Sequence, residues 1–115
     1  MQEQEFRARV VRFIVDGNPE RAVALLAKYY GVSVPELRVG TVKRHRKVLA
    51  CYVEKERRIY FSRSELLAQP FVVLHEFYHH LRTSELLRRR QVEKRADLFA
   101  DSFIREFKRL SPTLK

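Results

Sequence analysis

The sequence predicts an α+β fold in which a small three-stranded sheet packs against helices that precede and follow it. Apolar residues recur at helical spacing near both ends of the chain, and short runs of strand-forming residues lie between them. This order of elements is typical of α+β domains. With 115 residues, 45% of them hydrophobic and 33% charged, the chain has the length and composition of one globular domain. We expect that domain to cover residues 1–115.

Two amphipathic helices are predicted at the start of the chain. Residues 2–15 carry an apolar stripe at helical spacing, formed by Phe6, Val10, Phe13 and Ile14. A second helix is expected over residues 20–30. Asn18 suits its N-cap, Pro19 its first position and Gly31 its C-terminal end.

Three short strands are predicted in the middle of the chain. They cover residues 37–42, 48–53 and 58–61. A basic turn over residues 43–47 connects the first two, and residues 54–57 close a hairpin between the last two. The segment that follows, residues 62–69, is expected to be a connection with about one helical turn.

Two further helices complete the predicted fold. Pro70 suits the first turn of a helix that runs to about residue 83. The last helix is expected over residues 91–110, with an apolar stripe formed by Val92, Ala96, Phe99, Phe103, Phe107 and Leu110.

The helix that begins at Pro70 contains the pattern His-Glu-x-x-His at residues 75–79. On a helix, His75 and His79 lie about 40° apart around the axis, so that both imidazoles can bind one metal ion. Glu76 is offset from them, where its carboxylate can accept a proton from water. Polar side chains in a helix that is otherwise apolar need such a reason to be there. The pattern therefore predicts a zinc (Zn²⁺) site of the peptidase type, with Glu76 as the catalytic base.

A catalytic zinc ion usually has three protein ligands, so a third one is needed. His80 lies about 140° from His75 on the helix and should face away. Of the acidic residues on the last helix, Glu93 is the best candidate. Ala96 and Ala100 share its face and are small enough for this helix to approach the histidine helix closely. The other acidic residues of that helix are Asp97, Asp101 and Glu106.

Asp97 lies on the same helix face as Glu93, four residues further along. It is suited to accept a hydrogen bond from the free N–H of a ligand histidine, which fixes the ring and raises its basicity.

These residues resemble the gluzincin metallopeptidases, in which a glutamate helix follows the His-Glu-x-x-His helix. Residues 93–100, Glu-Lys-Arg-Ala-Asp-Leu-Phe-Ala, are similar to the corresponding element of ImmA/IrrE-type proteins. The length and charge also resemble the small archaeal minigluzincins of the proabylysin and projannalysin kind. The resemblance covers residues 48–103, about half of the chain. It departs from the family in Phe77 and Tyr78, which occupy positions where glycine is often found.

The resemblance implies a substrate-binding edge strand before the active-site helix. Ala50, Cys51, Tyr52 and Val53 would form that edge, and an extended peptide or protein substrate would pair with it through the main chain. The strand over residues 58–61 would then lie inside the sheet. The resemblance also implies that a terminal segment, here residues 111–115, can hold the enzyme latent as a zymogen.

The mechanism expected from these residues is hydrolysis of a peptide bond by metal-activated water. Glu76 takes the proton of the water and passes it to the leaving amine. A donor for the developing oxyanion is also needed. Tyr60, Tyr78, His80 and His45 are all candidates, and the sequence does not choose among them.

The overall charge leaves two alternatives to a peptidase. The net charge is +10, with basic clusters at residues 43–47 and 88–90. We interpret the clusters as solvated turns and keep, as alternatives, a non-catalytic zinc-binding protein and a basic nucleic-acid-associated protein. The lone Cys51 excludes an internal disulfide, and no apolar run is long enough to span a membrane. We therefore expect a cytoplasmic protein, whose oligomeric state the sequence does not define.

Overall fold

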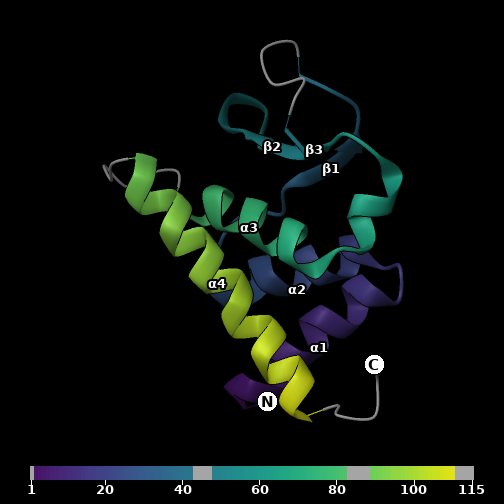
Figure 1. Ribbon diagram of the computed structural model, residues 1–115, viewed down its shortest axis with the longest axis vertical. Coiled ribbons are helices and arrows are strands. Elements are labelled where there is room, and N and C mark those ends of the chain that lie inside the picture. Colours follow the sequence, from purple (N-terminus) through teal and green to yellow (C-terminus); the bar gives the residue numbers. More distant parts are fainter. Residues whose placement is uncertain (1, 43–47, 83–88, 111–115) are drawn as a thin grey trace.

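The computed structural model describes residues 2–42, 48–82 and 89–110. The elements in chain order are α1 (Glu3–Val15), α2 (Pro19–Tyr30), β1 (Glu36–Val39), β2 (Ala50–Val53), the 3-10 helix η1 (Glu54–Glu56), β3 (Arg58–Phe61), the 3-10 helix η2 (Ser64–Ala68), α3 (Pro70–Leu81) and α4 (Arg89–Leu110). The described residues thus form four α-helices and a three-stranded mixed sheet (Figure 1). The predicted α+β class is confirmed at this level.

The two ends of α2 lie where proline and glycine place them. Pro19 is the first helical residue, and Gly31 adopts the left-handed conformation with φ of 70°, which a residue without a Cβ adopts most readily. The Gly31 N–H closes the helix on the carbonyl of Ala27. Asn18 occupies the N-cap position but makes no side-chain hydrogen bond to the helix, so its expected capping interaction is absent.

The sheet has the strand order β1-β3-β2, so that β3 is central and β2 lies at an edge. Strand β2 pairs with β3 in antiparallel register, from Ala50 opposite Phe61 to Val53 opposite Arg58. Strand β1 pairs with β3 in parallel. The expected inner position of residues 58–61 is therefore confirmed.

Strands β1 and β2 are shorter than the sequence predicts, whereas β3 has the predicted bounds. Strand β1 ends at Val39 instead of residue 42, and β2 begins at Ala50 instead of residue 48. One further backbone hydrogen bond continues the pairing beyond each of these strand ends. The Gly40 N–H donates to the carbonyl of Phe61, and the Ser62 N–H donates to the carbonyl of Leu49. Hydrophobic residues thus extend beyond the stretch that finds a strand partner.

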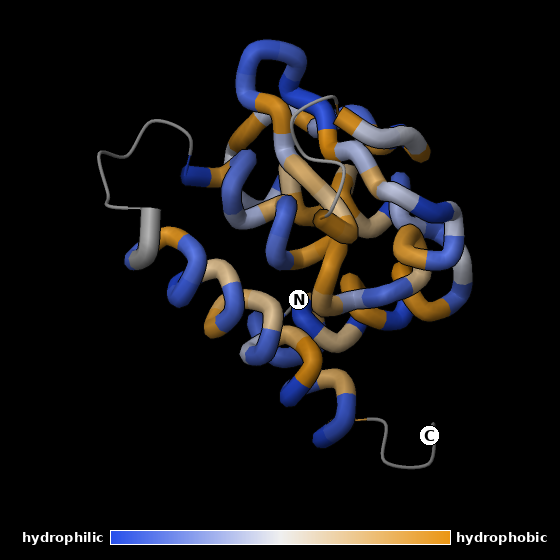
Figure 2. The backbone as a smooth tube through the Cα atoms, turned by 45° about the horizontal axis from the view of Figure 1, so that its top comes forward, coloured by the Kyte–Doolittle hydropathy of each residue, from blue (hydrophilic) through white to orange (hydrophobic). Residues whose placement is uncertain are grey.

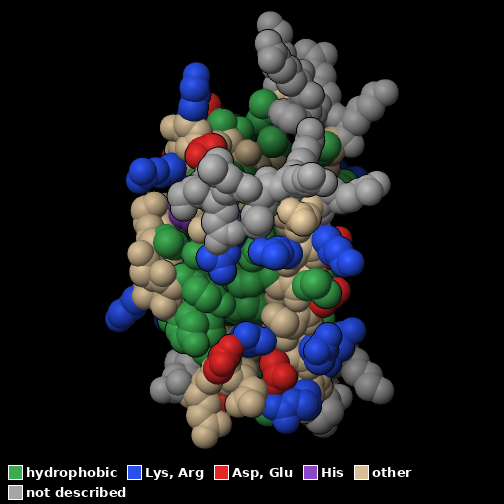
Figure 3. All heavy atoms as spheres, turned by 90° about the vertical axis from the view of Figure 1, so that its left-hand side faces the viewer, with side chains coloured by type: hydrophobic (Ala, Val, Ile, Leu, Met, Phe, Trp, Pro, Cys, Tyr) green, Lys and Arg blue, Asp and Glu red, His purple; other side chains and the backbone are tan. Residues whose placement is uncertain are grey.

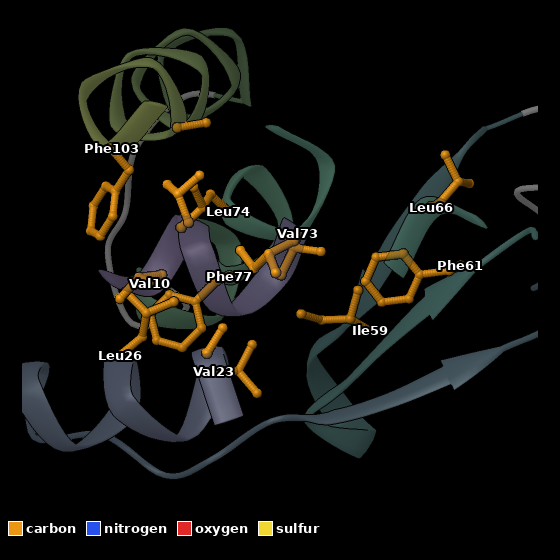
Figure 4. Close-up of a cluster of buried hydrophobic side chains, with 14 of the residues drawn as sticks. Val10, Val23, Leu26, Ile59, Phe61, Leu66, Val73, Leu74, Phe77 and Phe103 are labelled. Atoms are coloured by element: carbon orange, nitrogen blue, oxygen red, sulfur yellow. The ribbon is translucent and has the colours of Figure 1, made fainter. Parts of the chain in front are cut away.

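Helix α3 lies between the sheet and the other helices (Figure 1). In the core, Val73, Leu74 and Phe77 of α3 reach from Phe103 of α4 to Ile59 of β3 (Figure 4). All five side chains are fully buried. Burying such side chains contributes about 1.5–3 kcal/mol each, so the core fixes α3 relative to both neighbours.

Helix α4 crosses α1 and α3 on one side of the molecule (Figure 1). Hydrophobic and hydrophilic residues alternate along the coloured part of this helix (Figure 2). Its inner face includes Ala96 and Ala100, which are both fully buried, so its backbone approaches α3 closely. No helix in the described part of the chain is both long and apolar enough to cross a membrane.

Candidate metal centre

Helix α3 presents two histidines on one face. The Nε2 atoms of His75 and His79 lie 3.4 Å apart, and their ring centroids 5.1 Å apart. Both side chains are partly exposed, in contrast to the buried apolar side chains on the core face of the same helix. The helical period places the two imidazoles together, as their spacing of four residues requires.

Glu93 of α4 completes a group of three side chains. Its Oε2 atom lies 3.2 Å from the Nε2 atom of His75, and its Oε1 atom lies 2.8 Å from the Nε2 atom of His79. One ligand atom from each of the three residues falls within 4.8 Å of the others. Helices α3 and α4 pack against each other, and this packing brings the carboxylate within reach.

The spacing of these atoms fits a tetrahedral metal ion. Zinc lies about 2.0–2.2 Å from nitrogen and oxygen ligands, and tetrahedral angles then separate two ligand atoms by roughly 3.3 Å. The separations of 3.4 Å between His75 and His79 and 3.2 Å between His75 and Glu93 match this value, whereas the 2.8 Å between Oε1 of Glu93 and His79 is shorter than it. Two imidazole nitrogens and one carboxylate are also a donor set typical of catalytic zinc.

Asp97 determines which nitrogen of His75 carries the proton. Its Oδ1 atom lies 2.8 Å from the Nδ1 atom of His75. An ionised carboxylate only accepts hydrogen bonds, so Nδ1 is the protonated nitrogen. In the neutral ring Nε2 then keeps the lone pair, and this atom faces His79 and Glu93. The hydrogen bond that the helix spacing suggests is thus present, and it fixes the orientation of the His75 ring.

Glu76 lies beside this group, mostly buried. Burial raises the pKa of its carboxyl to about 7, partly countered by the charge that the His75 ring carries when both of its nitrogens are protonated. The negative charge of Glu93 raises the pKa further, and a hydrogen bond from the backbone N–H of Tyr52 lowers it. These directions apply to the protein without a metal ion. A carboxylate whose pKa lies near neutrality is well matched to accept and return a proton.

A cleft of about 530 Å³ opens at the site, between strand β2 and helices α3 and α4. Its lining residues are Val48, Ala50, Cys51, Tyr52, Glu54, Glu76, His79, Arg82, Val92 and Glu93. Three of the four residues expected in the substrate edge thus face the cleft, together with Glu76 and two of the three predicted metal ligands. Val53, the fourth, belongs to β2 but not to this lining.

The candidate oxyanion donors in the described residues lie elsewhere. The Tyr60 hydroxyl contacts Arg58 and Glu56. Tyr78 is buried with its ring against Phe99, and His80 is buried and hydrogen-bonded to other groups. None of the three lines the cleft.

Sequence analysis missed Arg82, which does line the cleft. Its guanidinium lies 5.7 Å from the ring of Tyr78. It follows His75 by seven positions, directly after the last residue of α3. On a continuing helix this spacing corresponds to about 20° around the axis, and it could have revealed Arg82. It brings a permanent positive charge to the same cleft as the candidate base.

Several sequence predictions concern residues outside the described ranges. These are the basic turn 43–47 with His45, Arg88 of the second basic cluster, and the terminal segment 111–115. On the face shown in Figure 3, Lys and Arg side chains lie apart, with acidic and apolar side chains between them.

None of the protein-family models, curated proteins or solved structures compared with this chain matches it. The case for a metal centre rests on the positions of His75, His79, Glu93 and Asp97 themselves.

Proposed function

We propose that this chain is a zinc-dependent metalloendopeptidase with a minimal zincin-like fold. The observation that carries the proposal is the convergence of His75, His79 and Glu93 at separations suited to a tetrahedral cation, with Glu76 beside them. A structural zinc site is usually closed by four protein ligands, whereas three ligands beside an open cleft are typical of catalysis. This favours an enzyme over a purely zinc-binding protein.

The roles of the residues follow from their chemistry. Zinc held by His75, His79 and Glu93 would lower the pKa of water and polarise a peptide carbonyl. Glu76 accepts a proton as the water oxygen adds to the carbonyl carbon. It returns that proton to the nitrogen as the C–N bond breaks. Asp97 holds the His75 ring in the tautomer that leaves Nε2 free to act as a ligand.

The substrate is a peptide in extended conformation, added to the edge of β2. In an antiparallel ladder alternate residues are bonded to the partner strand, and the bond from Ser62 to Leu49 fixes this alternation. Cys51 and Val53 are therefore the residues bonded to β3, whereas Ala50 and Tyr52 direct their main-chain groups outward. The carbonyls of Ala50 and Tyr52 and the N–H of Ala50 are the groups we expect a substrate to pair with.

Peptide hydrolysis by the zinc-loaded protein tests the proposal. We expect wild type to cleave unstructured polypeptides, and Glu76→Gln to lose at least about a hundredfold in kcat while it still binds one zinc ion. The matched control is Asp101→Asn, which removes one carboxylate from an exposed position of α4. Full activity of Glu76→Gln with zinc bound would overturn the assigned role of Glu76.

The same experiment separates the two alternatives. Zinc bound without any hydrolysis of a broad set of peptides would favour a non-catalytic zinc protein. No zinc after reconstitution, together with DNA binding that weakens steeply with salt, would favour the nucleic-acid-associated protein.

A further inference from the structure

His80 is a buried imidazole, 6% exposed, with a protein group at each ring nitrogen. Its Nε2 atom lies 2.7 Å from the carbonyl oxygen of Ser33, and its Nδ1 atom lies 2.8 Å from the hydroxyl of Tyr52. A carbonyl only accepts hydrogen bonds, so Nε2 carries the proton. In the neutral ring, Nδ1 then accepts a hydrogen bond from the Tyr52 hydroxyl. Both partners are thus matched by a single tautomer.

Tyr52 connects this imidazole to the candidate base. Its side chain reaches His80, and its backbone N–H, which points outward from the sheet, donates to the carboxyl of Glu76. Because β2 is an edge strand, β3 holds it on one side only. The bond to His80 ties it to α3, the helix that also carries Glu76.

We propose that His80 and Tyr52 are positioning residues for the catalytic base: His80 holds the Tyr52 side chain, and the Tyr52 backbone N–H orients the Glu76 carboxylate. The effect on catalysis that we expect from this arrangement rests on the proposed peptidase function. The structural part of the inference holds for the protein without metal.

The arrangement has a clear physical purpose. A misplacement of about 1 Å in a catalytic group can reduce a rate a hundredfold, so a base beside a sheet edge needs that edge to be fixed. A hydrogen bond between partly buried side chains is directional, whereas apolar packing at the same place would let the strand slide. The link also fixes the outward groups of Ala50 and Tyr52 relative to α3.

Amide hydrogen exchange in the metal-free protein tests the structural part. The Tyr52 amide points away from β3, so the sheet does not protect it, and we expect its protection to disappear in Glu76→Ala. In Tyr52→Phe, which removes only the hydroxyl, exchange at residue 52 should become roughly fivefold faster, the effect of one lost hydrogen bond. The amides of Cys51 and Val53, which face β3, serve as internal references. Unchanged exchange at residue 52 in both variants would overturn the proposal.

The kinetic part uses Tyr52→Phe, His80→Gln and their combination in the zinc-loaded protein. Glutamine keeps an N–H donor for Ser33 but offers no acceptor at the position of Nδ1. We expect each single change to lower kcat roughly fivefold with KM and zinc content preserved, and the double change to be no worse than the stronger single one. Tyr60→Phe is the matched control, because it removes a hydroxyl hydrogen-bonded to Arg58 and Glu56 that does not line the cleft.

These readouts distinguish failure of the inference from failure of the proposed function. Additive losses, or equal losses in Tyr60→Phe, would overturn the positioning role even in an active peptidase. If the wild-type protein hydrolyses no peptide, the exchange at residue 52 still decides whether His80 and Tyr52 orient Glu76.

Discussion

Two neighbouring histidines of α3, His79 and His80, face different sides of the helix and have opposite surroundings. The Nε2 atom of His79 faces the Nε2 atom of His75 and the carboxylate of Glu93. The ring of His80 instead has a carbonyl at one nitrogen and a hydroxyl at the other. Adjacent helical residues diverge by about 100°, so one turn of helix serves both purposes.

The difference indicates how a candidate ligand histidine is distinguished from a structural one. His80 has a donor or acceptor of matching kind at each nitrogen, so it needs no further partner. His75 and His79 instead direct two nitrogens and a carboxylate oxygen at one point, where a cation can bind all three. Proximity to an HExxH pattern is therefore a weaker criterion than the partner of each ring nitrogen.

Zinc affinity gives the largest expected difference between the two histidines. If three ligands share a binding free energy of about 10–16 kcal/mol, His79→Gln should weaken zinc binding by roughly a thousandfold. His80→Gln should change it less than roughly threefold, because the residue meets only protein groups. Competition with a zinc-chelating dye measures both, with circular dichroism as a check of folding. Equal losses in the two folded variants would contradict the comparison.

The pH dependence of stability in the metal-free protein is expected to differ next most. Burial holds the pKa of Glu76 at about 7 in the folded protein, above its ordinary value of 4.5. The folded state then binds the proton more tightly than the unfolded state, so stability is lost as pH rises from about 4.5 to 7. Glu76→Gln avoids this loss and should stabilise the metal-free protein by about 3 kcal/mol at pH 8, and hardly at pH 4.

Urea unfolding at several pH values with a chelator present would measure this effect. Glu65→Gln is the control, since Glu65 is exposed and its ion pair with Arg63 spans 3.8 Å in solvent. A stabilisation by Glu76→Gln that is the same at pH 4 and pH 8 would rule out the raised pKa as its cause.

Local features of the chain predicted much of the fold. Proline and glycine place both ends of α2 and the start of α3, and the helical period alone brings His75 and His79 together. The pairing of β1 was not predicted, because its parallel bonds to β3 join residues more than 20 positions apart and depend on the whole core. The lengths of β1 and β2 were overestimated for the same reason, because a hydrophobic run does not show where its partner strand ends.

The candidate site also has one part that local sequence features predict and one part that depends on distant residues. The small side chains of Ala96 and Ala100, which are both buried, were the local signal that α4 approaches α3. This signal led to the prediction that Glu93 and Asp97 lie near His75. The contact between Tyr52 and His80 spans 28 residues and has no local signal. The helical spacing correctly predicts that His80 faces away from His75. It does not indicate which groups His80 contacts on that side.

The smallest effect we expect concerns Asp97, which gives His75 the same kind of fixed tautomer that Ser33 gives His80. Asp97→Ala removes the acceptor and should weaken zinc binding about tenfold, as loss of such a partner usually does. Asp97→Asn should be at least as harmful despite its similar shape, because its amide N–H can donate to Nδ1. That moves the ring proton to Nε2, the atom that must bind the metal. Zinc titration of both variants, with Asp101→Asn as the control, decides the matter. An asparagine that binds zinc as tightly as wild type would show that Asp97 does not select the tautomer.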